Sequence, residues 1–214
     1  MGQYYRPILK INNRIEVLNR NLIIDGDEEY TMAKLMEHSW IGNWLMETVC
    51  DRIYNSDKPV RLIWMGDYAD QFADDLKTTF NGLTKKQIKN YHKAAWGEPD
   101  RGMTIFRASF DFKNKYIVNH TKKEYVDFSL YYESSVMNCD GDMWCIHPLS
   151  ILTAIGNEYG GGDYRSPTLA STFELVGYWA WDEINITDEI PAGYELLQPL
   201  FKETGWEETE KEVI

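Results

Sequence analysis

The chain has 214 residues, of which 43% are hydrophobic, and a formal net charge of −12 from 34 acidic and 22 basic side chains. This composition excludes a disordered chain, and no apolar run approaches the roughly 20 residues that span a bilayer, so we expect no membrane partner. The acidity argues against direct nucleic-acid binding through phosphate contacts, which requires a basic surface. Three cysteines, an odd and small number, favour a reducing, cytoplasmic location over a disulfide-stabilised secreted protein.

The N-terminal part of the chain predicts a hairpin followed by a long helix. Two β-prone runs, 3–11 and 15–18, flank Asn12-Asn13, and asparagine tolerates the left-handed dihedrals of a tight turn. From 31 to 53, apolar residues recur at three- and four-residue steps, which predicts one helix with a single buried stripe. A glycine inside that segment weakens its middle, so a break near 39–42 also fits the pattern.

The remainder of the chain predicts a mixture of strands and helices. The apolar run 60–65 predicts a buried strand, and 68–96 predicts two polar helical pieces separated by Asn81-Gly82. Shorter strands and apolar elements are expected at 103–106, 116–118, 125–128, 147–154, 184–186 and 194–197. We therefore predict an α+β fold: a single domain over 1–202, with a mostly antiparallel sheet, the long helix and further helices packed on it, and an acidic, frayed tail at 203–214.

The first candidate site is a glycine-rich segment that contains three successive glycines. Gly161 and Gly162 stand between Asn157 and Asp163. Glycines in succession cost backbone entropy, so a fold keeps them where the chain turns sharply or approaches another group, and their amides can bind an anion. The segment matches neither a phosphate-binding loop nor a dinucleotide motif. An ordinary surface loop is the alternative interpretation.

The second candidate site follows the predicted buried strand. Asp67 and Tyr68 come directly after a glycine at the carboxyl end of this strand, where ligands gather in sheets with helical crossovers. A carboxylate at such a place can act as a base, a ribose-hydroxyl acceptor or a metal ligand. It can equally cap the helix that follows it.

Histidines supply the third group of candidates. His38 is expected on the long helix, His120 at a hairpin turn and His147 at the start of an apolar element. A general base or a metal site needs two or three such groups to converge, which one sequence does not reveal. Each histidine taken alone is more often a structural hydrogen-bonding group.

No metal site is predicted, although one weak candidate set exists. Cys139, Cys145 and His147 offer two thiolates and an imidazole within nine residues. Structural zinc sites usually pair cysteines two to four residues apart, and here five residues intervene without a fourth ligand nearby. Cys50 or His120 would have to complete the set.

Several distinctive blocks point to one family. They are MGQYY at the start, MEHSW with the following GN, GDYA at 66–69, YIVNHTKK at 116–123, HPL at 147–149 and GGGDY at 160–164. In these blocks the chain resembles a family of uncharacterised bacterial and phage proteins, which implies a phage or prophage origin more than a mechanism. It departs from the family pattern at Tyr159, where members carry arginine, and at Trp181, where they carry a small or basic residue. If that arginine serves an anionic ligand, the preference of this chain has changed.

The resembling blocks also supply many polar side chains beside segments expected in the core. Since burying an unpaired polar group costs about 1–3 kcal/mol, these groups should either bond to one another or line a shared cleft. We expect the cleft, as a ligand-binding site made by His38, Asn43, Asp67, Tyr68, Asn119, His120, His147, Asn157, Gly161, Gly162 and Asp163.

Two functions fit these observations. The first is a cytoplasmic phage or prophage protein that binds and blocks a host component, either as an acidic protein decoy or as a sponge for a nucleotide-like ligand. The alternative is a hydrolase or transferase acting on a nucleotide-like small molecule. In that case Asp67 or His120 would be the base, and Asp163 would position substrate or metal. No cofactor and no oligomeric state is predicted.

Overall fold

The computed structural model describes residues 4–18, 20–24, 27–31, 34–35, 43–97, 105–106, 110–128, 136–137, 143–144, 147–156 and 175–197. Its helices are α1 (Trp44–Tyr54), α2 (Ala69–Asp75), α3 (Lys85–Trp96) and α5 (Pro148–Leu152). The longer strands are β1 (Tyr4–Ile11), β2 (Arg14–Val17), β3 (Arg20–Ile24), β4 (Asp27–Thr31), β6 (Val60–Gly66), β10 (Tyr116–Asn119), β11 (Glu124–Asp127) and β15 (Glu183–Thr187). Two-residue strands are β5 (Lys34–Leu35), β7 (Thr79–Phe80), β8 (Leu83–Thr84), β9 (Ile105–Phe106), β12 (Val136–Met137), β13 (Met143–Trp144), β14 (Ala154–Ile155) and β16 (Glu195–Leu196).

A nine-stranded sheet organises the described chain. Its main path runs β16-β11-β10-β15-β6-β1-β2, with β14 added beside β6 and β5 beside β1. Every pair in it is antiparallel except β11 with β16 and β14 with β6. The central strand β6 pairs with β1 along one edge. Its other edge is shared, by β15 at Val60 and Arg61 and by β14 at Trp64 and Met65.

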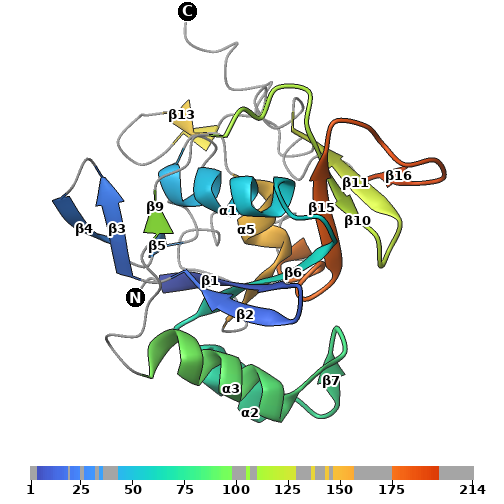
Figure 1. Ribbon diagram of the computed structural model, residues 1–214. Coiled ribbons are helices and arrows are strands. Elements are labelled where there is room, and N and C mark those ends of the chain that lie inside the picture. The colour runs from blue at the N-terminus through green and yellow to red at the C-terminus, as the bar shows by residue number, and fades with distance from the viewer. Residues whose placement is uncertain are drawn as a thin grey trace, which may run out of the picture.

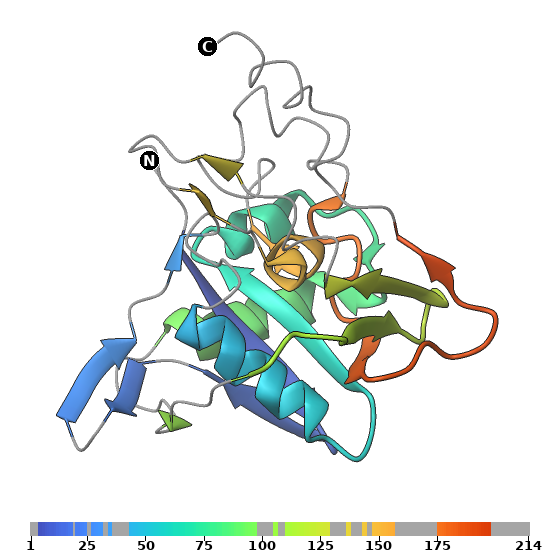
Figure 2. The same cartoon turned by 90° about the horizontal axis from the view of Figure 1, so that it is seen from above.

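Helices cover both faces of this sheet, as Figure 1 shows with α1 and α5 above it and α2 and α3 below. Figure 2, seen from above, shows α1 over the sheet, running roughly along β1 and β6. Successive residues of β6 therefore enter different cores: Leu62 and Trp64 join the cluster that contains the α1 and α5 residues, whereas Ile63 and Met65 join that of α2 and α3. A strand covered on both faces is a continuous apolar run, and this explains the sequence of β6.

The α+β class with a mostly antiparallel sheet is confirmed, and so are its main hairpins. Asn12 and Asn13 adopt φ values of 46° and 67° between β1 and β2, as a two-residue turn that matches the strand twist requires. Asn81 and Gly82 do the same between β7 and β8.

The prediction of one helix over 31–53 is wrong in its first part. Thr31 ends β4, and β5 at Lys34–Leu35 pairs with the start of β1. The helix begins only at Trp44, because the Asn43 side chain caps it by accepting a hydrogen bond from the Leu45 amide at 3.0 Å. The helical prediction therefore fails at Thr31 and Lys34–Leu35, whereas 36–42 lies outside the described residues. The expected tail at 203–214 lies outside the described residues.

Candidate functional site

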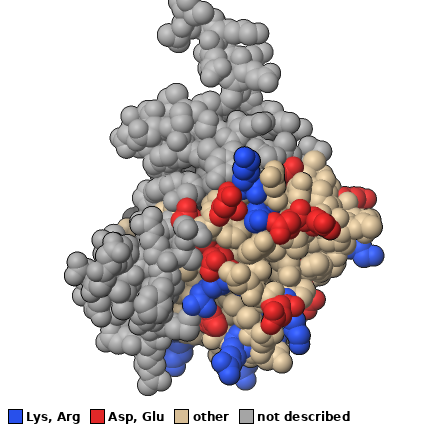
Figure 3. All heavy atoms as spheres, turned by 45° about the horizontal axis from the view of Figure 1, so that its top comes forward, with Lys and Arg blue, Asp and Glu red and all other residues tan. Residues whose placement is uncertain are grey.

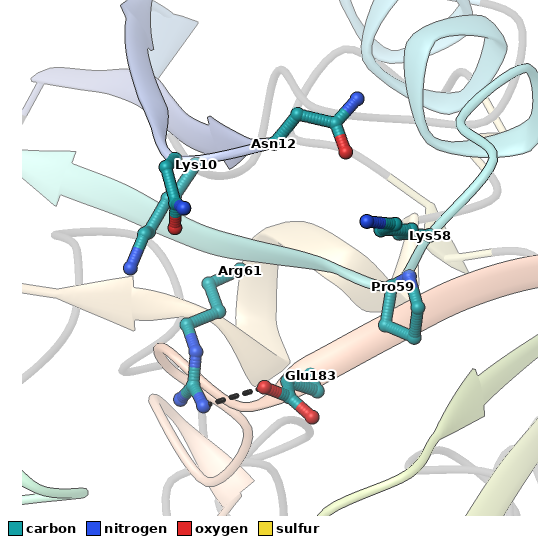
Figure 4. A pocket seen from close by; sticks show the side chains of 7 residues that line it. Lys10, Asn12, Lys58, Pro59, Arg61 and Glu183 are labelled. Carbon is teal, nitrogen blue, oxygen red and sulfur yellow. Dashed lines mark hydrogen bonds and ion pairs between the residues drawn. The ribbon is translucent and has the colours of Figure 1, made fainter.

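A polar pocket with a volume of about 270 Å³ lies at one end of the β1–β6 ladder (Figure 4). We call it the basic pocket, and its lining residues are Lys10, Asn12, Asn13, Lys58, Pro59, Arg61 and Glu183. Strand β1 and its turn contribute the first three, the segment before β6 and β6 itself the next three, and β15 the last. Three cations thus face a single carboxylate on a chain whose net charge is strongly negative.

The sheet register places like charges side by side in this pocket. Lys10 of β1 is the direct cross-strand partner of Arg61 of β6, and Glu183 of β15 is the partner of Arg61 on the opposite edge. Like charges directly opposite each other in an antiparallel pair are destabilising, by an amount within the roughly 0.2–1 kcal/mol that such pairs are worth. This arrangement therefore works against the stability of the free protein, and a bound anion would relieve it.

Arg61 is held in place by two acceptors. Its Nη1 donates to the Trp181 carbonyl oxygen at 2.7 Å, and its Nη2 donates to Glu183 Oε1 at 2.8 Å (Figure 4 marks this second contact). The backbone of Trp181 has φ of 66°, a left-handed conformation that is unfavourable for a bulky residue. The residue whose carbonyl group orients the Arg61 guanidinium is thus in a strained backbone conformation.

The other donors of the pocket are not engaged. The Lys10 and Lys58 amines make no ion pair or hydrogen bond with any described residue, and Lys58 is exposed. Asn12 and Asn13 expose their side-chain amides at the turn that ends β1. Two ammonium groups and two amides are the donor types that bind a multiply charged oxyanion.

Most of the net negative charge belongs to residues outside the segments whose side chains are described. The segments whose side chains are described contain 16 acidic and 15 basic residues, whereas the whole sequence contains 34 and 22. Those segments therefore carry a net charge of −1, and the rest of the sequence carries −11. On the face shown in Figure 3, acidic and basic side chains are interspersed.

Asp67 lies in the turn between β6 and α2, as the sequence predicted. Its Oδ1 accepts from the Tyr4 amide at 3.3 Å, and its carbonyl oxygen lies 2.9 Å from His92 Nε2. Partial burial raises the pKa of Asp67, and the hydrogen bond from the Tyr4 amide and the charge of the nearby His92 oppose the rise. Tyr68 occupies the N-cap position of α2 without a side-chain cap hydrogen bond. Asp67 thus ties β1 to β6, which is a structural contact.

Asn119 and His120 lie at the turn of the β10–β11 hairpin. Asn119 is buried, and its Nδ2 donates to Asp182 Oδ2 at 2.8 Å, an oxygen that also lies 3.0 Å from Lys122 Nζ. His120 Nδ1 lies 2.9 Å from the Tyr194 hydroxyl, and its main-chain amide donates to the Glu183 carbonyl at 2.8 Å. Asn119 is therefore satisfied internally, whereas His120 supports the strand that carries Glu183.

Asn43 and His147 are used as helix caps instead of ligands. His147 is fully buried: its Nδ1 accepts from the Leu149 amide at 3.1 Å, and its Nε2 lies 3.2 Å from Cys50 Sγ. Because Nδ1 is an acceptor, the proton of the neutral ring is on Nε2 and points to the sulfur. Burial lowers the pKa of His147 to about 3, and burial together with nearby acids raises the pKa of Cys50. The pair is neutral, the reverse of an activated thiolate and imidazolium.

The described candidates do not meet in one cleft. Asn119 pairs with Ile184, which pairs with Val60 at the start of β6, whereas Asp67 follows the last residue of β6. The six steps along β6 from Val60 to Gly66, at about 3.3 Å each, separate the two levels by about 20 Å. The register of the sheet therefore puts Asn119 and Asp67 at opposite ends of β6 and does not bring these two candidates together.

The remaining candidates of the ligand-binding, catalytic and metal sets lie outside the described residues, and they are His38, Asn157, Gly161, Gly162, Asp163, Cys139 and Cys145. His147 of the metal set has both ring nitrogens engaged, as described above. Among the described side chains, no three His, Cys, Asp or Glu residues are grouped as a metal ion would require.

Sequence analysis missed the basic pocket, although two signals for it were available. Arg61 interrupts the apolar run of β6, and Lys10 likewise interrupts the apolar run of β1. A charged residue in each of two neighbouring buried strands suggests that the strands emerge from the core at that point. Only the register shows that these two cations are opposite each other.

Comparison with protein-family models, with curated proteins and with solved structures gives no match. Within the described ranges, no helix combines the length and the apolar character that crossing a membrane requires.

Proposed function

We propose that this protein binds and sequesters a phosphate-bearing small molecule of the nucleotide class. Of the functions expected from the sequence, this is the ligand sponge, which as a phage or prophage product in the cytoplasm would withhold such a molecule from its host. One observation carries the proposal: Lys10 and Arg61 are direct cross-strand partners beside Lys58, in a pocket on an acidic protein. Oxyanions such as phosphate match this set of donors.

The acidic-decoy version of the binding function has less support from the described surface. A decoy of nucleic acid needs a continuous negative face. The described side chains are almost balanced in charge, so the excess that a decoy would use belongs to other parts of the sequence. The enzyme alternative has less support as well, since the only carboxylate among the described lining residues, Glu183, is paired with Arg61.

Isothermal titration calorimetry with pyrophosphate and ADP tests the proposal. We expect 1:1 binding that weakens as NaCl is raised from 50 to 300 mM, because salt screens partly exposed charges. Lys10→Ala and Lys58→Ala should each weaken binding by about tenfold, as expected for loss of one charge-assisted contact. Mass spectrometry of the recovered ligand should show it unchanged, and a converted product would favour the enzyme.

Lys77→Ala is the matched control. Lys77 is exposed and its amine makes no hydrogen bond or ion pair with a described residue, so this variant removes the same charge away from the pocket. Equal weakening by all three substitutions would mean that only the overall charge matters. Either that result or the absence of any binding by the unmodified protein contradicts the proposal.

A further inference from the structure

The lining of the basic pocket indicates which part of a ligand it contacts. Lys10, Lys58, Arg61, Asn12 and Asn13 all present donors of hydrogen bonds, and none of the described lining residues is aromatic. Nucleobases are usually held by stacking on an aromatic or guanidinium plane. The Arg61 guanidinium already donates hydrogen bonds to the Trp181 carbonyl and to Glu183. The pocket thus offers contacts for phosphate oxygens and few for a base.

The cations in this pocket form two unequal subsites. Lys10 and Lys58 are without partners among the described residues, so either amine can bind a phosphate group directly. Arg61 is occupied by Glu183, through an ion pair whose side chains are 33% and 48% exposed. Pairs as exposed as this contribute little to stability, so a competing anion can displace the carboxylate. A guanidinium binds phosphate through two parallel hydrogen bonds, which favours the exchange.

We propose, building on the function above, that the pocket recognises a diphosphate or longer polyphosphate group regardless of what is attached to it, and that Glu183 is the residue that sets this preference. A diphosphate reaches both subsites, with one phosphate at Lys10 and the other replacing Glu183 at Arg61, because Lys10 and Arg61 are direct cross-strand partners. A single phosphate binds only the first subsite and is repelled by the neighbouring carboxylate. Glu183 therefore discriminates against singly phosphorylated molecules.

Titration of the full chain with four probes tests this inference: orthophosphate, pyrophosphate, ADP and adenosine. The unmodified protein should bind pyrophosphate at least about tenfold more tightly than orthophosphate, and ADP within about threefold of pyrophosphate, with no binding of adenosine. In Glu183→Gln, orthophosphate should bind about tenfold more tightly, because Arg61 is then open to it. The discrimination between the two anions should shrink accordingly.

Glu195→Gln is the matched control, because Glu195 is an exposed carboxylate outside the pocket and its removal changes the net charge equally. Thermal melting should show that both variants are folded. If pyrophosphate binds but Glu183→Gln preserves the discrimination, or acts no differently from Glu195→Gln, the role of Glu183 is overturned while the binding function stands. ADP binding far more tightly than pyrophosphate would overturn base-independent recognition. Failure of every probe to bind would overturn the proposed function itself.

Discussion

Two polar regions of this protein, the buried Cys50–His147 pair and the basic pocket, differ in how their polar groups are satisfied. In the first, both ring nitrogens of His147 have partners, the phenyl rings of Phe112 and Phe128 pack against the imidazole, and both groups are neutral. In the second, Lys10 and Lys58 keep their charge without a partner among the described residues. The first region completes the fold, whereas the two lysine amines of the second make no hydrogen bond or ion pair with a described residue.

This difference separates structural polar groups from those available to a ligand better than residue type does. Histidine and cysteine are the residue types usually associated with catalysis, yet here they stabilise a helix start inside the core. Lysine and asparagine near a turn are usually solvated surface residues, yet here the sheet register gathers them with an arginine in one pocket. Substitutions in the two regions should therefore have opposite effects on stability.

The largest expected effect is that of His147→Ala. This substitution removes the acceptor that caps α5 and leaves a cavity beside Phe112 and Phe128, so the free energy of unfolding should fall by about 3 kcal/mol. Urea denaturation followed by circular dichroism at pH 7 measures it. His147→Asn is the matched variant, because an asparagine oxygen can still cap the helix, and it should lose less. A loss below 1 kcal/mol in the alanine variant would contradict the structural role assigned to this histidine.

The second effect is a loss of stability in mild acid. The folded-state pKa of His147 is lowered by burial to about 3, whereas the unfolded chain titrates near the ordinary value of 6.5. Between these values the unfolded state binds more protons than the folded state, so this contribution to stability is present above pH 6.5 and is lost as the pH falls toward 3. At pH 5 the loss relative to pH 7 should be about 2 kcal/mol.

Urea titrations at several pH values measure this dependence. The same series on His147→Asn provides the control, because asparagine does not titrate. The loss of unfolding free energy between pH 7 and pH 5 should therefore be smaller in this variant by about the contribution of the imidazole. An identical slope in both proteins would show that His147 is accessible to protons in the folded state, against its full burial.

Much of the sheet could be predicted from the sequence, since local patterns determine it. The Asn12-Asn13 turn and the apolar run of β6 each specify their own structure within a few residues. The strand residues at Thr31 and Lys34–Leu35, where a helix was expected, show the limit, because apolar spacing is equally compatible with strands that find partners far along the chain, as β5 does with β1. The basic pocket depends on such long-range pairing. Each of its cations can be noticed in the sequence, but that they lie close together cannot be predicted from it.

The smallest effect concerns the like-charge pair itself. Because Lys10 and Arg61 face each other directly and Lys10 has no ion pair to a described residue, replacing its charge in Lys10→Gln should raise the free energy of unfolding by a few tenths of a kcal/mol in 20 mM salt. In 0.5 M NaCl the gain should disappear, since screening then weakens the repulsion. Lys77→Gln, which changes the charge elsewhere, should show no such gain. If Lys10→Gln is more stable and no longer binds pyrophosphate, Lys10 serves ligand binding and lowers the stability of the free protein. If Lys10→Gln is less stable, Lys10 is a structural residue.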